Sequence, residues 1–158
     1  MIGNIPKTAV VGDMMRFVVE TPSCVRSDEC MGQALQRMVD APCSRHVYVL
    51  GEGEKVVGSI RLNCLIEFFF PYSAFLGSQV LDRLFNLVMK KSVQEFMLRN
   101  FSYVHEETKA TETLTIMLRE KVNELPVVDN QMRLMGEVNM LEVVKFYFDR
   151  NGHHCQVG

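Results

Sequence analysis

The sequence predicts an α/β protein built from two pseudo-symmetric β-α-β-β-α repeats that pack through their sheets. Short motifs recur at separations of 78 to 82 residues, and apolar residues change from helical to strand spacing in the same order in each copy. The length of 158 residues suits one compact module. A repeat of about 60 residues buries little surface alone, so we expect the two copies to share a core.

The repeat is visible in three blocks of residues. The first block is the pattern V-x-acid-apolar-M, which begins at Val11 and again at Val93. Later matches, with separations of 79 and then 78 positions, include Leu35 and Leu114, Val47 and Pro126, and Gly58 and Gly136. A drifting separation is typical of loop insertions. We place the inserted residues in the loop before residue 25 and in the turn at 51–54.

Each copy contains the same elements in the same order. A short strand near Val25 or Val104 precedes an amphipathic helix, which begins near Met31 in the first copy and at Ala110 in the second. Two β-rich runs separated by a polar turn follow, and an apolar helix closes the copy. These predicted runs and closing helices are 46–50, 55–60 and 62–70 in the first copy, and 125–128, 134–138 and 140–148 in the second.

The domain organisation follows from these elements. We expect a first repeat at 5–70, a connecting helix and linker at 71–91, a second repeat at 92–148 and a tail at 149–158. The connection carries apolar residues at helical spacing and charges on its other side, which favours a helix over a flexible linker.

Composition excludes several classes of protein. A hydrophobic fraction of 47% with 23% charged residues is typical of a folded globular chain. The net charge of −2 provides no basic field for a nucleic acid, so we expect no such partner. The most apolar stretch, 64–76, contains Glu67 and Pro71 and falls short of the roughly 20 residues that cross a bilayer, so we expect no membrane span.

Neither a metal site nor a catalytic arrangement is expected. The five cysteines form an odd set without CxxC or a secretory leader, which favours reduced thiols and a cytoplasmic location. His46 and His105 lack a nucleophile in a recognisable motif. The tail sequence His153-His154-Cys155 lacks a fourth ligand at a diagnostic spacing. We therefore predict that the chain is not an enzyme.

The order of these signatures, with the run L-P-V-V-D at 125–129, resembles the CBS domain of the cystathionine β-synthase type. Two copies in tandem resemble a Bateman module, and the resemblance covers about 5–148. It implies a regulatory module that binds an adenosine compound such as AMP, ADP, ATP or S-adenosylmethionine. In this family, two clefts each combine a G-x-x-[TS]-x-x-D loop of one repeat with the residues before the second strand of the other.

In the second repeat this motif reads G-E-V-N-M-L-E, which places Asn139 at the Thr position and Glu142 at the Asp position. The resemblance implies that the carboxylate accepts hydrogen bonds from the ribose hydroxyls. It also implies that the side chain at the Ser or Thr position, where Asn139 can still donate a hydrogen bond, meets the phosphate together with the helix-start amides. The expected ligand-binding residues are Asn139, Leu141 and Glu142, facing Ser44, Arg45 and His46. An alternative is that Glu142 only favours the helix dipole and needs no ligand.

In the first repeat, Arg61 stands at the Thr position and Cys64 at the Asp position. A thiol is a weak hydrogen-bond acceptor, so we expect weaker binding here. The residues expected in this second cleft are Arg61, Asn63, Cys64 and Asn123.

The sequence therefore predicts a stand-alone CBS-pair protein that senses an adenine nucleotide or related adenosine metabolite and signals to an effector protein. Two alternatives are a structural dimerisation module without a ligand and the regulatory part of a larger enzyme or transporter. The closing helices and the segment 68–76 carry more aromatic side chains than a small core can hide. We therefore expect a homodimer joined through apolar helices.

Overall fold

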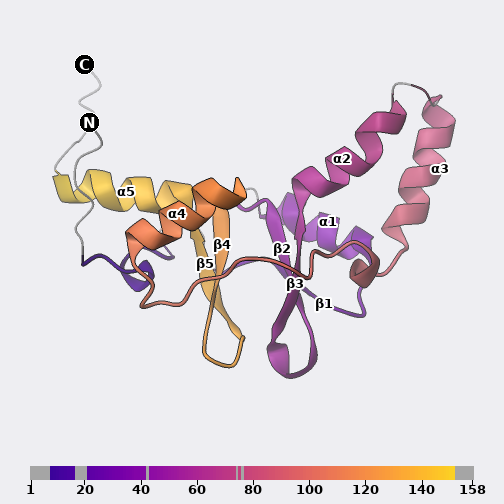
Figure 1. Cartoon of the computed structure of the whole chain (residues 1–158). Helices are drawn as coiled ribbons and strands as arrows, with labels where there is room; N and C mark the ends of the chain where they lie inside the picture. The colour runs from indigo at the N-terminus through magenta and orange to yellow at the C-terminus, as the bar shows by residue number, and fades with distance from the viewer. Residues whose placement is uncertain (1–7, 17–20, 42, 74, 76, 152–158) are drawn as a thin grey trace, which may run out of the picture. The chain divides into compact units, whose positions relative to one another are not determined.

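The computed structural model describes residues 8–16, 21–41, 43–73, 75 and 77–151, the side chains of 69–73, 150 and 151 excepted (Figure 1). The chain divides into two compact units. Unit 1 combines the N-terminal segment up to Thr21 with the chain from Ser102 onward, and unit 2 is Pro22–Phe101. The mixture of small sheets and helices in each unit confirms the predicted α/β class.

Unit 2 is a three-stranded sheet with helices. Strand β2 lies in the middle, parallel to β1 and antiparallel to β3. Its elements are β1 (Cys24–Arg26), α1 (Met31–Asp40), β2 (His46–Leu50), the 3-10 turn η2 (Glu52–Glu54), β3 (Val56–Arg61), α2 (Leu62–Ser73), α3 (Ser78–Met89) and the 3-10 turn η3 (Val93–Glu95). The connecting segment thus contains the predicted helix, α3, and this helix packs against α1 and α2.

Unit 1 repeats this plan with a reduced first strand. Strands β4 and β5 are antiparallel, and a single parallel bridge from Val104 to Val127 stands where β1 stands in unit 2. Its elements are the 3-10 turn η1 (Val11–Asp13), α4 (Ala110–Glu120), β4 (Glu124–Val128), β5 (Leu134–Asn139) and α5 (Met140–Asn151). The predicted β-α-β-β-α order is therefore present in both copies, while the packing of the two sheets against each other stays a prediction.

The strand registers correct one detail of the predicted alignment. Val47 pairs with Ile60, and Leu125 pairs with Val138. Val47 therefore corresponds to Leu125 and not to Pro126. The β2–β3 and β4–β5 connections are of equal length, so the extra residue of the first copy lies between α1 and β2, not in the turn at 51–54. Neighbouring apolar residues of a buried strand look alike in a sequence, whereas pairing fixes which of them faces which side.

The leading segment of each repeat packs in the unit that holds the sheet of the other repeat. In unit 1, the Val11 amide donates to the Thr108 carbonyl and the Ala110 amide donates to the Ala9 carbonyl, both at 2.9 Å. In unit 2, the Val93 amide donates to the Glu29 carbonyl at 3.0 Å. The V-x-acid-apolar-M motif thus marks the part of each repeat that completes the other copy's unit.

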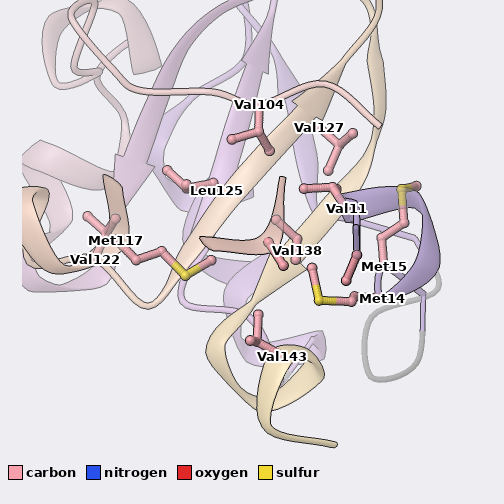
Figure 2. Close-up of a cluster of buried hydrophobic side chains, with 12 residues drawn as sticks. Val11, Met14, Met15, Val104, Met117, Val122, Leu125, Val127, Val138 and Val143 are labelled. Carbon is pink, nitrogen blue, oxygen red and sulfur yellow. The ribbon is translucent and has the colours of Figure 1, made fainter. Parts of the chain in front are cut away.

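Each unit has its own apolar core. Figure 2 shows the core of unit 1, where Val11, Met14 and Met15 of the N-terminal segment lie with side chains from β4, β5 and α5. The buried members of this core are Ala9, Val11, Met14, Met15, Val104, Ala110, Met117, Val122, Leu125, Val127, Val138 and Val143. The corresponding core of unit 2 consists of Val25, Met31, Ala34, Met38, Val47, Val49, Ile60, Leu65, Val93 and Met97.

Candidate functional site

The start of α5 brings together the two residues that the motif singled out. Asn139 ends β5, and α5 begins at the next residue. The Asn139 amide donates to Oε2 of Glu142 at 2.9 Å, and the Glu142 amide donates to Oδ1 of Asn139 at 3.0 Å. This reciprocal pair is a capping box, which satisfies two backbone donors at the helix start.

Both side chains of this capping box are buried. Asn139 is 3% exposed and Glu142 is 0% exposed. Oδ1 of Asn139 must be the atom that faces the Glu142 amide, because only the oxygen can accept a hydrogen bond. Nδ2 of Asn139 therefore points elsewhere, and it is a buried donor without a partner among the described residues.

Three further residues lie beside this helix start within unit 1, of which two are polar and one is apolar. The Asn123 carbonyl accepts a hydrogen bond of 2.7 Å from the Met140 amide, although the Asn123 side chain is exposed. Leu141 is 63% exposed, so it presents an apolar surface beside the capping box. Glu124, which is buried, pairs with Asn139 across the two strands.

Sequence reasoning missed the two buried glutamates of this sheet. Glu124 is 5% exposed and Glu137 is 0% exposed. The signal was their position inside the short strands β4 and β5, because an ionisable side chain between apolar strand neighbours is seldom buried without a reason. The start of α5 is therefore more acidic and more enclosed than the motif alone indicated.

The start of α2 has the same backbone arrangement with different side chains. The Leu62 amide donates to the Arg45 carbonyl at 3.0 Å, as the Met140 amide does to Asn123. Arg61 precedes this helix, and a guanidinium cannot accept a hydrogen bond from helix amides. Nε of Arg61 is a buried donor without a partner among the described residues. Asn63 is exposed, and Cys64 is a half-buried free thiol.

The segment before β2 is held by local hydrogen bonds. Oγ of Ser44 lies 3.2 Å from the His46 carbonyl oxygen and 3.3 Å from the His46 amide. Ser44 and His46 are buried, while Arg45 is exposed. The His46 ring stacks on Tyr48, with a centroid distance of 6.2 Å and an angle of 4° between the ring planes.

The residues predicted to bind a ligand therefore fall into two groups, one in each unit. Arg45 and His46 lie beside Leu62 and Arg61 in unit 2, since His46 pairs with Arg61 and Arg45 bonds Leu62. Asn123 lies beside Met140 in unit 1. The predicted cleft in which Ser44, Arg45 and His46 face Asn139 joins residues of the two units and stays a prediction.

The described residues provide neither a metal-binding cluster nor a membrane-spanning helix. The described part of the chain contains no group of three or more His, Cys, Asp or Glu side chains that could hold a metal ion. The sequence His153-His154-Cys155 lies outside the described residues. None of the described helices is both long and apolar enough to span a membrane.

Comparisons of sequence and of structure both show that this chain is similar to CBS-domain proteins. Residues 93–149 match the family model of the CBS domain. A CBS domain-containing protein from Thermotoga maritima has a similar crystal structure, with a TM-score of 0.70 and 26% identity over 94% of this chain and 99% of that chain.

Two further solved structures share the fold. The CBS domain pair of protein MJ0100, in complex with 5′-methylthioadenosine and S-adenosyl-L-methionine, has a TM-score of 0.66 at 18% identity and covers 90% of this chain and 98% of that chain. CBSX2 in complex with AMP has a TM-score of 0.68 at 22% identity, with the same coverage.

A curated relative matches over part of its length. Homoserine O-acetyltransferase from Methanococcus vannielii is 25% identical over 113 residues, which cover 66% of this chain and 23% of that protein. The chain therefore spans about a quarter of that relative's length.

Proposed function

We propose that this chain, a CBS-domain pair, is a regulatory protein that binds an adenine nucleotide or a related adenosine metabolite. The observation that carries the proposal is the enclosed polar pair Asn139 and Glu142 at the start of α5. This pair occupies the motif position at which the family resemblance places the ligand. Two proteins of the same fold were crystallised with AMP and with S-adenosyl-L-methionine, which supports this ligand class.

The proposed ligand site includes residues of both repeats. We place Asn139, Leu141 and Glu142 on one side and Ser44, Arg45 and His46 on the other. Binding at this site is expected to be stronger than at a second site formed by Arg61, Asn63, Cys64 and Asn123. The physical reason is the difference at the helix starts: α5 has a buried capping box, whereas α2 has an arginine that cannot cap it and a thiol in place of a carboxylate.

A thermal-stability screen tests this function directly. The full chain is melted with AMP, ADP, ATP, NADH or S-adenosylmethionine. A ligand that binds only the folded protein adds about 2.7 kcal/mol of stability at a hundred times its Kd. We expect at least one adenosine compound to raise the Tm in a concentration-dependent manner. No shift with any compound would contradict the proposal.

The regulatory output requires other proteins. We propose that the chain forms a homodimer and passes the ligand signal to an effector protein in the cytoplasm, without catalysis of its own. Exposed apolar side chains in unit 2 support self-association: Ile66 is 52% exposed, Phe68 is 40% exposed and Phe75 is 87% exposed. The four described cysteines are free thiols, which agrees with a reducing compartment.

A ligand-independent dimerisation module is the second candidate. The start of α2, with Arg61 and Cys64 at the two motif positions, favours it because neither side chain can accept the ribose hydrogen bonds that a carboxylate accepts. This candidate predicts a stable dimer and no thermal shift with any adenosine compound.

A further inference from the structure

We propose that α3 of unit 2 attaches to the surface of an anionic lipid bilayer without crossing it. The exposed apolar side of the helix enters the bilayer interface, and the basic side chains beside it contact the lipid headgroups. The helix has 12 residues, too few to span a bilayer but enough to lie in its interface. This inference concerns a second partner of the chain and does not depend on the adenosine site.

Helix α3 leaves an apolar surface open to solvent. It packs against α1 and α2, yet Val88 is the only buried residue in the helix. Val80 is 50% exposed and Leu87 is 59% exposed. These two residues are separated by about two helical turns, so they lie on the same side of the helix. The stripe that Val80 and Leu87 form is therefore not covered by any of the described residues.

The chain just before α3 adds an aromatic side chain to this surface. Phe75 precedes the first residue of α3, Ser78, by three positions and is 87% exposed. Figure 1 shows that α3 begins well away from the strands of unit 2 and runs back toward them. A protruding helix start with an exposed aromatic ring can enter a bilayer interface while the rest of the unit stays in water. Ile66 and Phe68 of α2 remain available for self-association.

The charges of α3 are distributed unequally about the stripe. Arg83 follows Val80 by three positions and precedes Leu87 by four, so it lies beside both. Lys90, whose backbone continues the right-handed turn, follows Leu87 by three positions. Both basic side chains are exposed, and neither forms an ion pair with a described residue. Asp82, the one acidic residue of α3, is two positions from Val80 and so faces another side.

These charges indicate which partner covers the stripe. Arg83 lies midway between Val80 and Leu87, so pairing α3 with a second copy about a twofold axis would bring the two Arg83 guanidinium groups together. Like charges that meet across a contact weaken it. An anionic bilayer instead presents negative headgroups above an apolar layer. Basic side chains beside an exposed apolar stripe match that order, as they do in helices that lie in the membrane interface.

Cosedimentation of the full chain with lipid vesicles tests the proposal. Vesicles of phosphatidylcholine are compared with vesicles in which about one third of the lipid is phosphatidylserine. The variant Leu87→Ser removes apolar surface, and Arg83→Glu reverses one charge. Val39→Ser and Lys55→Glu are the matched controls, because Val39 is 67% exposed on α1 and Lys55 is exposed between β2 and β3. All four substituted side chains are exposed, so each variant keeps the core of unit 2.

We expect the wild type to bind the phosphatidylserine vesicles about tenfold or more tightly than the phosphatidylcholine vesicles. This preference should disappear in about 1 M salt, which screens exposed charges. Arg83→Glu should weaken binding to the phosphatidylserine vesicles by about tenfold or more, because an attraction becomes a repulsion. Leu87→Ser should weaken binding to them by about fivefold, because less apolar surface leaves water. Both controls should bind within about twofold of the wild type.

Three results would overturn the proposal. The first is a wild type that binds neither kind of vesicle. The second is equal weakening by Arg83→Glu and Lys55→Glu, which would show that net charge acts and not the surface of α3. The third comes from sedimentation without lipid: if Leu87→Ser dissociates a dimer and leaves vesicle binding unchanged, the stripe is a contact between copies. None of these results affects the adenosine site, which the thermal-stability screen tests separately.

Discussion

Gly58 and Gly136 occupy equivalent places in the two sheets and meet equivalent methionines. Gly58 pairs with Val49, and Gly136 pairs with Val127. A Cβ on Gly136 would lie 2.6 Å from Cε of Met15, the far end of a flexible side chain. A Cβ on Gly58 would lie 2.7 Å from Sδ of Met97, and 3.0 and 3.1 Å from its Cγ and Cβ. Met15 can rotate away from an added methyl group, whereas the whole Met97 side chain stands in its path.

This difference yields a prediction at the residue scale. Gly58→Ala should lower the free energy of unfolding by about 1–3 kcal/mol, the range for overpacked cores. Gly136→Ala should lower it by less than about 1 kcal/mol, because a terminal methyl group moves at little cost. Urea unfolding of both variants beside the wild type measures the two changes. Equal losses would show that the methionine contact does not decide the outcome.

The candidate site could be predicted from the sequence only in part. The spacing of Asn139 and Glu142 at a strand-to-helix junction predicted that they lie together, which the structure confirms. An Asn followed three residues later by a Glu is also a sequence signature of a capping box, so their mutual capping was open to prediction and was missed. The burial of Nδ2 of Asn139 without a partner among the described residues depends on tertiary packing, which the sequence pattern does not specify.

Two turns determine how α4 and the strands of unit 1 connect. Lys121 ends α4 with φ of 54° and ψ of 44°, the left-handed region that favours glycine. The turn between β4 and β5 is held by Asp129, whose Oδ1 accepts hydrogen bonds from the Gln131 and Arg133 amides at 2.8 and 2.9 Å. For each turn we predict how a substitution changes the stability of the fold.

Lys121→Gly should raise the free energy of unfolding by about 0.5–1 kcal/mol. A residue with a Cβ pays for the left-handed conformation, and glycine relieves that strain although it loses more backbone entropy on folding. Lys90, which ends α3 with φ of −89°, is the matched control. Lys90→Gly should give no gain, since its backbone is already right-handed. Thermal or urea unfolding distinguishes the two, and a similar effect of both substitutions would contradict the argument.

Asp129 predicts a pH dependence of stability. Hydrogen bonds from the Arg133 amide, its guanidinium and the Gln131 amide lower the pKa of the Asp129 carboxyl. A carboxyl with a lowered folded-state pKa stabilises the fold above its unfolded pKa, and this stability is lost as the pH falls through the folded value. Asp129→Asn should therefore be less stable than the wild type at neutral pH.

The stability difference between Asp129→Asn and the wild type should shrink as the pH falls through the range from the unfolded pKa to the folded one. Urea unfolding at a series of pH values measures it. A difference that stays constant from neutral to acid pH would show that the ionised carboxylate contributes nothing to the turn.

At the element scale, the existence and order of the helices and strands could be predicted from the sequence better than the register of the strands. The helical spacing of apolar residues identified α1, α3 and α4, because a 3.6-residue period is visible over three turns. Strands of five or six buried residues show no such period, and the alignment of Val47 with Pro126 was wrong by one position for that reason. Hydrogen-bond pairing, which the sequence does not display, sets the register.

Assembly belongs to the scale of the whole molecule. We predict that the wild type sediments as a dimer at micromolar concentration and that Phe68→Asp raises the dimer Kd by about tenfold or more. A charge at a buried aromatic contact costs desolvation as well as packing. Leu118→Asp is the control, because Leu118 is 72% exposed on α4, outside the proposed contact. Monomeric wild type, or equal weakening by both variants, would contradict the prediction.

The compact units could not be predicted from the repeat alone. The motif at Val11 and Val93 showed which residues are equivalent, but equivalence does not state on which sheet a segment packs. The burial of Val11 with Val127 and of Val93 with Val49 shows that each leading segment belongs with the other repeat's sheet. The sheet on which a leading segment packs depends on the three-dimensional path of the chain. The spacing of motifs along the sequence does not indicate that path.

Because each leading segment packs with the sheet of the other repeat, the residues of the two units are completed at different times during synthesis on the ribosome. Unit 2 is continuous, so every residue that it needs has been made once Phe101 has been added. Unit 1 needs residues from both sides of unit 2, and Val11, Met14 and Met15 lack their core partners until Val138 and Val143 have been translated. Domains fold as their residues become available, so unit 2 folds first and unit 1 forms last. Throughout that interval these three apolar side chains remain unburied, a hydrophobic surface of the kind that chaperones bind.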